Sequence, residues 1–214
     1  MKKLLKWFGI SFGILLAVSI IVAIFLPEES SEVDDQDIQK INNFNVEPGL
    51  GELGARFNMN LETYTDNFNN IMDNKILHLD NWEYGVQTSM QGTEEMFEHY
   101  FYRLSDTILL RVVVESSTGK INSVYIEGPF ENGSESEVNT LIELMNGTFC
   151  ALTGIDTEVG FDVIYEVSTT TYTTCMVYEN ICMKFTTDLG DGTVFMIVPV
   201  SEDVLATMEY TNIE

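Results

Sequence analysis

An uncharged apolar run near the N-terminus constrains this chain more than any other feature. It extends from Trp7 to Leu26, and Ser11 and Ser19 are its only polar side chains. A helix of 20 residues rises about 30 Å, which is the thickness of the hydrocarbon core of a bilayer. A helix buried in a globular core keeps a polar face, and this run has none. We therefore predict a transmembrane helix over residues 7–27.

The charges that flank the run predict its direction across the membrane. Lys2, Lys3 and Lys6 precede it, whereas Glu28 and further acidic residues follow it. Positively charged flanks stay on the cytoplasmic side. Residues 1–6 are therefore expected in the cytoplasm, and the C-terminal domain is expected to be extracytoplasmic, in a single-pass protein of the cell membrane.

A cleaved secretory signal peptide is the competing interpretation. The triplet Ala17-Val18-Ser19 has the small residues of a cleavage site. However, the apolar run continues for seven residues beyond the triplet, which is longer than the apolar region of most signal peptides. This length favours an uncleaved signal anchor.

The chain beyond the anchor is strongly acidic. It carries 7 basic and 34 acidic residues, a net charge of −27. Nucleic acid is excluded as a partner, because its phosphates would be repelled. A self-repelling surface of this kind favours solubility, and a cationic partner or scattered divalent-cation sites are the functional alternatives. Residues 28–56 combine clustered acids with Pro48-Gly49, which predicts a flexible stalk and leaves residues 57–214 as the folded domain.

Helix signals recur three times beyond the stalk. Asn60 is a good N-cap for the helix that follows it. Ser134 and Glu137 form a capping box ahead of a long apolar stripe, and Gly154 suits the C-terminal end of that helix. A shorter helix is expected over about residues 157–167.

Strand signals occupy most of the remaining sequence. Two strands are expected within residues 76–104, one hairpin within 108–126, a second within 172–187 and a last strand at 194–200, with 201–214 as a short helix or a frayed tail. Because helices and runs of strands are separate, the pattern predicts an α+β domain of two layers, in which an antiparallel sheet of about six to seven strands is packed by two to three helices. The order of a helix followed by a meander occurs twice, which suggests the hypothesis of two related halves.

The three cysteines leave room for one internal disulfide at most. Cys150 falls in an apolar helix stripe and is interpreted as a core residue. Cys175 and Cys182 are directly opposite if the hairpin loop between them holds six residues. If the turn consists only of Glu179-Asn180, they are diagonal neighbours with Cα atoms about 7 Å apart, near the upper limit for a disulfide.

Signatures of catalysis and of metal binding are weak. The two histidines, His78 and His99, have no cysteine or carboxylate at zinc-ligand spacing. No Gly-x-Ser-x-Gly nucleophile elbow occurs in the sequence. Residues 188–192 resemble a calcium loop only superficially, because the alternating oxygen ligands and the closing glutamate are missing. We assign no catalytic residue, no cofactor and no metal ligand.

A cluster of aromatic residues is the best candidate for a binding face. Trp82, Tyr84, Tyr100 and Tyr102 lie on neighbouring predicted strands, and an exposed aromatic row of this kind is typical of an interaction surface. The expected function is therefore a membrane-anchored binding or accessory domain of the cell envelope, without catalytic activity, whose partner is a protein or a small ligand. The first alternative is an acidic inhibitor or immunity-type protein that masks a basic partner, and the second is a hydrolase of unrecognised type.

Overall fold

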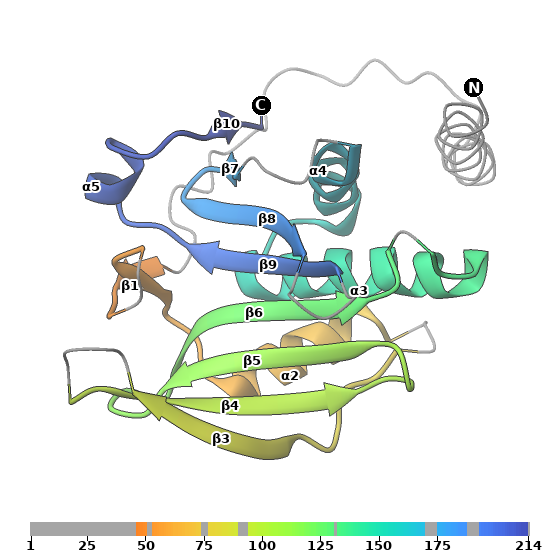
Figure 1. Cartoon of the computed structure of the whole chain (residues 1–214), viewed down its shortest axis with the longest axis horizontal. Helices are drawn as coiled ribbons and strands as arrows, with labels where there is room; N and C mark the ends of the chain where they lie inside the picture. Colours follow the sequence, from red (N-terminus) through yellow and green to blue (C-terminus); the bar gives the residue numbers. More distant parts are fainter. Residues whose placement is uncertain are drawn as a thin grey trace. The chain divides into compact units, whose positions relative to one another are not determined.

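Figure 1 shows the computed structural model of the chain. The structure describes residues 46–50, 53–73, 77–89, 94–130, 132–169, 175–187 and 193–213. The predicted anchor at residues 7–27 and the first part of the predicted stalk lie outside the described residues. Among the helices that the structure describes, none has the length and apolarity needed to cross a bilayer.

The described domain is α+β with one large, mostly antiparallel sheet, as the sequence predicts. Its eight strands follow the order β10-β7-β8-β9-β6-β5-β4-β3, and only β10 and β7 pair in parallel. The strands are β3 (Glu83–Ser89), β4 (Met96–Arg103), β5 (Leu109–Glu115), β6 (Lys120–Gly128), β7 (Met176–Tyr178), β8 (Ile181–Thr187), β9 (Thr193–Pro199) and β10 (Thr211–Asn212). Seven of them correspond to predicted strands. The eighth, β10, comes from the C-terminal tail, and it is held there because the neighbouring Ile213 is buried.

Four helices accompany the sheet in the described part of the chain: α2 (Leu61–Ile71), α3 (Glu135–Thr153), α4 (Thr157–Thr169) and α5 (Glu202–Leu205). Asn60 caps α2 by accepting a hydrogen bond from the backbone N–H of Thr63, at 2.8 Å. The predicted capping box of α3 is confirmed, since the Ser134 side chain accepts from the N–H of Glu137 and Glu137 accepts from the N–H of Ser134. Gly154 ends α3 with φ of 76°, a left-handed conformation that glycine adopts without strain.

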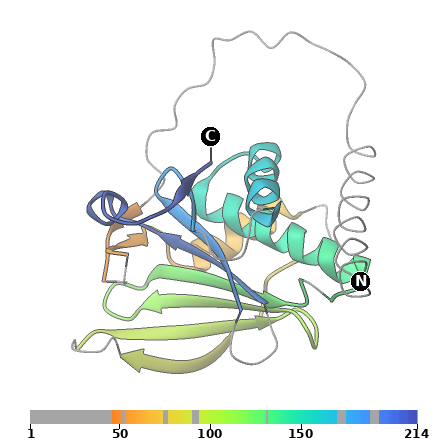
Figure 2. The same ribbon diagram turned by 45° about the horizontal axis from the view of Figure 1, so that its top comes forward.

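The helices α2 and α3 lie on one face of the sheet, and α4 packs against α3 (Figures 1 and 2). We call this side of the sheet the helix face. Tyr64 and Phe68 of α2 are fully buried in one hydrophobic core with Phe149 of α3. The sheet supplies alternate residues to the same core, among them Leu110 and Phe195. Close contact between α3 and α4 depends on Gly160, because a Cβ atom there would lie 2.3 Å from the Sγ atom of Cys150.

The last part of the predicted stalk differs from the structure. β1 (Val46–Pro48) and β2 (Ala55–Phe57) form an antiparallel hairpin, and β2 packs against β6 and β9. Ala55 and Phe57 are only 2% and 1% exposed. The acidic and glycine residues around Ala55 and Phe57 dominate the composition of residues 28–56. The short alternation of these two apolar residues is therefore not evident from composition. The folded chain therefore already includes Val46, ahead of the predicted boundary at residue 57.

The C-terminal hairpin settles the geometry of the cysteines. β7 and β8 are joined by the two-residue turn Glu179-Asn180, and Val177 pairs with Cys182. Cys175 is thus a diagonal neighbour of Cys182, with the Cα atoms 6.1 Å apart, and the two form a disulfide. Cys150 is a buried free thiol, and burial, together with the charge of Asp156, raises its pKa to about 12. It is a core residue, as predicted.

The order of a helix followed by a meander is present twice among the described elements. α2 precedes the strands β3 to β6, whereas α3 and α4 precede β7 to β9. The two meanders join where β6 pairs with β9. The hypothesis that the halves are related stays a prediction.

The capping box gives a first prediction about stability. Ser134→Ala removes the side chain that accepts from the N–H of Glu137, so we expect the free energy of unfolding to fall by about 1 kcal/mol. Ser136→Ala is the matched control, since Ser136 is exposed in the same turn and only its backbone carbonyl accepts a bond, from Thr140. Urea denaturation followed by circular dichroism measures both. Equal losses in the two variants would contradict a capping role for Ser134.

Candidate functional site

The structure brings the four predicted binding residues to one side of the sheet. Tyr84 pairs with Tyr100 across β3 and β4, and their ring centroids are 5.6 Å apart. Trp82 and Tyr102 form a second edge-to-face pair, with centroids 5.9 Å apart. Tyr100 and Tyr102 alternate along β4 and both pack against the core. All four therefore lie on the helix face, at the end of the sheet formed by β3 and β4.

Two of these four residues, Trp82 and Tyr102, make contacts within the domain. The indole N–H of Trp82 donates to Thr65 Oγ1 at 3.0 Å, and the ring lies 6.2 Å from the ring of Tyr64. The hydroxyl of Tyr102 donates to the carbonyl oxygen of His78 at 2.8 Å. Both side chains thus connect the outer strands to α2 and to the segment that follows it. They contribute to packing more than to an accessible surface.

The other pair is closer to solvent. Tyr84 is 56% exposed, and its neighbour Val86 is exposed to the same fraction. Tyr100 is half-buried and donates its hydroxyl hydrogen to Glu98 Oε2 at 2.7 Å. That hydrogen bond, assisted by burial, raises the pKa of Tyr100 to about 12. The accessible part of the predicted face is therefore centred on Tyr84, whose ring packs against the less exposed ring of Tyr100.

Tyr84 belongs to the outermost strand of the large sheet. Every residue of β3 is exposed, and β3 pairs with β4 alone among the described strands. The register shifts between Tyr84 and Gln87, which interrupts the regular ladder. Gly85 lies within this interruption, and a Cβ atom there would be 2.1 Å from the ring of Phe101. Glycine is thus required for β3 to approach β4 at this point.

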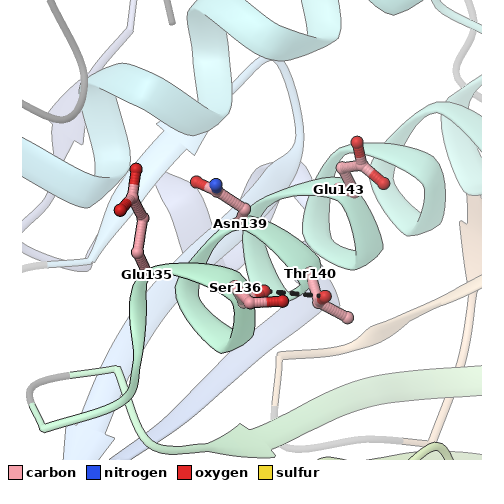
Figure 3. A pocket seen from close by; sticks show the side chains of 5 residues that line it. All are labelled: Glu135, Ser136, Asn139, Thr140 and Glu143. Carbon is pink, nitrogen blue, oxygen red and sulfur yellow. Dashed lines mark hydrogen bonds between the residues drawn. The ribbon is translucent and has the colours of Figure 1, made fainter. Parts of the chain in front are cut away.

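A shallow depression of about 380 Å³ lies on the first half of α3 (Figure 3). Its lining consists of the polar residues Glu135, Ser136, Asn139, Thr140 and Glu143. All of them come from the same helix, so they present a hydrophilic surface and do not surround a point where a ligand atom would sit. This arrangement indicates a solvated helix surface.

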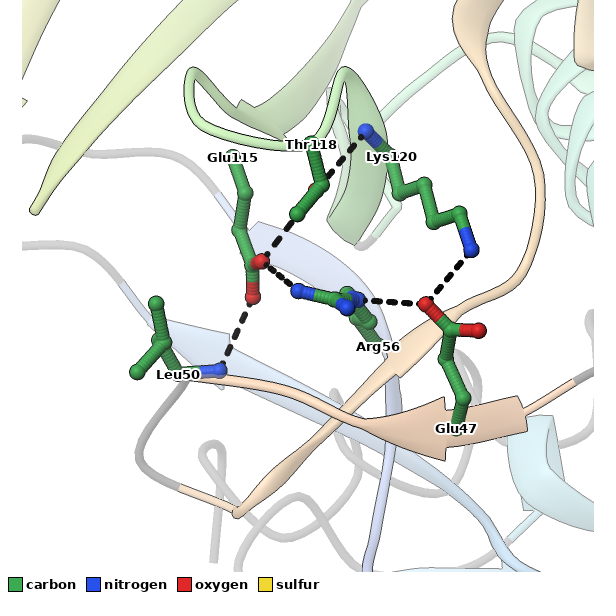
Figure 4. A network of polar contacts seen from close by, with 6 residues as sticks. All are labelled: Glu47, Leu50, Arg56, Glu115, Thr118 and Lys120. Atoms are coloured by element: carbon green, nitrogen blue, oxygen red, sulfur yellow. Dashed lines mark hydrogen bonds and ion pairs between the residues drawn. The ribbon is translucent and has the colours of Figure 1, made fainter.

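A network of charged residues is centred on Glu115 (Figure 4), and we call it the hairpin clasp. Glu115 on β5 is only 1% exposed. It accepts hydrogen bonds from the guanidinium of Arg56 and from the backbone N–H of Leu50. Glu47 accepts from Arg56 Nε at 2.7 Å and from Lys120 Nζ at 2.6 Å. The clasp therefore fixes the β1–β2 hairpin to the strands β5 and β6.

The charges of the clasp stabilise one another. Hydrogen bonds from Lys120 and Arg56 hold the pKa of Glu47 below its usual value, so this carboxylate stays ionised to a lower pH than a free glutamate does. A depressed pKa means that the stabilisation is present at neutral pH and is lost as the pH falls through the lowered pKa. Sequence reasoning missed the clasp because its members are far apart in the chain, and only the tertiary fold joins them. Its satisfied hydrogen bonds indicate a structural role.

The two histidines have no metal-binding surroundings in the described part of the molecule, where no group of three His, Cys, Asp or Glu side chains converges. The Nε2 atom of His99 shares a hydrogen bond with Thr88 Oγ1 at 2.9 Å. Burial and the nearby Arg111 lower the pKa of His99. The backbone carbonyl of His78 accepts the hydroxyl hydrogen of Tyr102.

Comparison of the chain with models of protein families, with curated protein sequences and with solved structures found no match.

The clasp gives a second prediction. Arg56→Ala leaves the carboxylate of Glu115 buried without its cation, so we expect the free energy of unfolding to fall by about 3 kcal/mol. Lys120→Ala is the control, because it removes a cation from Glu47, whose side chain is 27% exposed and better solvated. It is therefore expected to cost clearly less. Thermal or urea unfolding provides the measurement, and a Lys120→Ala loss as large as that of Arg56→Ala would contradict this account.

Proposed function

We propose that this protein is a membrane-anchored, extracytoplasmic binding domain of the cell envelope without catalytic activity, and that its partner contacts the outer end of the sheet at β3. The observation that carries the proposal is Tyr84, a large aromatic side chain that is 56% exposed on the edge strand of the sheet. Tyrosine is enriched at the energetic centres of protein interfaces, because it buries a large area at a small entropic cost.

The surroundings of Tyr84 support this assignment. The ring of Tyr100 holds that of Tyr84 in an edge-to-face contact, so little conformational freedom remains to be lost on binding. Val86 adds a second exposed apolar side chain on the same strand. Because the register shift at this point interrupts the regular backbone ladder, we assign recognition to the side chains of Tyr84 and Val86 and not to the addition of a further strand.

The anchor is the second part of the proposal. The uncharged run at residues 7–27 is long enough to span a bilayer as a helix, and its flanking charges favour a cytoplasmic N-terminus. Val46 is the first residue of β1, which leaves residues 28–45 between the anchor and the domain. This segment would span at most about 60 Å when fully extended. A partner within that distance of the membrane surface is therefore accessible to the domain.

A second candidate function is the acidic inhibitor that masks a basic partner. One observation favours it: the helices α2, α3 and α4 contain no lysine or arginine. Their eight carboxylates are Glu62, Asp66, Glu135, Glu137, Glu143, Glu158, Asp162 and Glu166. In this case the partner would contact the helical layer and not β3, and association would slow as the ionic strength rises.

Photo-crosslinking at defined positions tests the two candidates together. A photoreactive phenylalanine analogue replaces Tyr84 in the full-length protein in its native membrane, and in a matched variant it replaces Tyr165 of α4, which is 41% exposed. We expect a discrete crosslinked adduct from position 84 only. An adduct from position 165 only, which no longer forms when crosslinking is carried out at high salt, would favour the inhibitor function instead. Adducts from neither position would contradict both proposed surfaces.

The anchor itself predicts an intact N-terminus. Membrane fractions should contain a chain that retains residues 1–27, identified by N-terminal peptide mass spectrometry after alkaline washing of the membranes. A mature chain beginning near Ile20, released into the medium, would instead show that the triplet Ala17-Val18-Ser19 is cleaved.

A further inference from the structure

The face of the sheet opposite the helix face has no described helix over its middle. The β1–β2 hairpin lies against β6 and β9, and its Arg56 contacts Glu115 on this face. At its other end α5 packs over Val177, Cys182 and Val200 through Val204 and Leu205. The remaining outward residues of β4, β5, β6, β9 and β8 form what we call the open face. Figure 1 shows the sheet in front of α2 and α3, with the open face toward the reader.

Strand register places one row of large side chains across the open face. The row consists of Phe101, Arg111, Tyr125, Met196 and Lys184, each paired with the next across five adjacent strands. All five side chains are half-buried. The guanidinium carbon of Arg111 lies 4.2 Å from the ring centroid of Tyr125, so the cation is stacked on the aromatic ring.

The open face also carries the basic residues of the described chain that lie outside the hairpin clasp. Five lysine and arginine residues fall within the described chain, and two of them, Arg56 and Lys120, belong to the hairpin clasp. The other three, Arg103, Arg111 and Lys184, all lie on the open face, and the ion pairs among described residues involve none of them. The Nε atom of Arg111 is buried and has no hydrogen-bond partner in the described part of the protein.

Outside the hairpin clasp, where Glu115 and Glu47 are paired with Arg56 and Lys120, the described strands place two carboxylates on this face, fewer than its three cations. Glu127 belongs to the next row, in register with Leu109 and Val194, and Glu83 lies at the edge opposite Phe101. The open face thus carries a local excess of positive charge in a chain whose net charge is −24. The helices α2 to α4 on the other side of the sheet carry acidic residues and no basic ones.

We propose that the open face binds an acidic, partly apolar segment of a partner protein. A guanidinium pairs with a carboxylate through two parallel hydrogen bonds, and Arg111 is already held in place by its stacking on Tyr125. Phe101 and Met196 supply apolar contacts beside it. Arginine, tyrosine, phenylalanine and methionine are the residues enriched at the centres of protein interfaces.

Charge also argues against other occupants. A second copy of this chain docked face to face would bring the cations of two open faces together, which is unfavourable. Nucleic acids and anionic lipid surfaces are repelled by the strongly negative remainder of the chain. A short acidic segment carries far fewer negative charges, so the long-range repulsion on it is weaker, and the attraction of the nearby cations acts within about one Debye length.

A peptide selection on the full-length protein in lipid nanodiscs tests the proposal. The probe is a phage-displayed library of random 12-residue peptides, and the most enriched sequence is then synthesised for affinity measurement. We expect enrichment of aspartate and glutamate interspersed with aromatic or aliphatic residues. The double variant Arg111→Gln/Lys184→Gln should weaken binding of the synthetic peptide at least tenfold. A selection that enriches no acidic peptides overturns the proposal.

A charge-matched variant separates the open face from the net charge of the protein. Ser168→Glu/Thr207→Glu changes the net charge by the same amount at two exposed positions outside the open face, and it should change the affinity less than twofold. Equal weakening in both double variants overturns the proposal. If the Arg111 variant does not fold, Lys184→Gln alone should still weaken binding threefold or more, and an unchanged affinity there is equally decisive.

One further outcome is informative. Binding of the protein to phosphatidylglycerol vesicles in the absence of any acidic-peptide binding would assign the open face to lipid and overturn the proposal. The inference does not depend on the proposed function at β3, because it concerns the opposite side of the sheet. A failed crosslink at Tyr84 and a failed peptide selection are therefore distinguishable results.

Discussion

Burial of one face of the large sheet by α2 and α3 determines most of what this domain presents to solvent. A strand places successive side chains on opposite faces, so a sheet needs a second layer wherever its residues are apolar. Along β5, Leu110 and Val112 point into the helical layer and are fully buried. On the other side, Arg111 is only half-buried, because no described helix covers it. The open face and the exposed edge at β3 both follow from this one-sided layering.

The hairpin clasp compensates for part of the missing second layer. A carboxylate as deeply buried as Glu115 is tolerated only when cations and hydrogen-bond donors satisfy it. Arg56 and the N–H of Leu50 do so, and in doing so they hold β1 and β2 against the sheet. The clasp uses two of the five basic residues in the described chain. The three that remain are therefore available to a partner on the open face.

Local signals in the sequence predict the α+β class and most of the elements. The Asn60 cap, the Ser134 capping box and the two hairpins depend on residues close together in the chain, and each is present in the structure. The β1–β2 hairpin and β10 were missed, since their stability comes from distant partners. The four predicted aromatic residues share one face, but periodicity alone does not predict that Trp82 and Tyr102 are occupied by contacts with Thr65 and His78.

The distribution of charge shows why a net value is a poor guide to a partner. From the sequence, an excess of 27 negative charges beyond the anchor suggests a cationic partner. The fold separates the charges instead, because the charged residues of α2, α3 and α4 are all acidic, whereas the cations outside the ion pairs of the described chain lie on strands. Arg111 and Lys184 are 73 residues apart in sequence, yet they lie in one row of the sheet. Opposite sides of one domain therefore favour partners of opposite charge, and only the strand register reveals this.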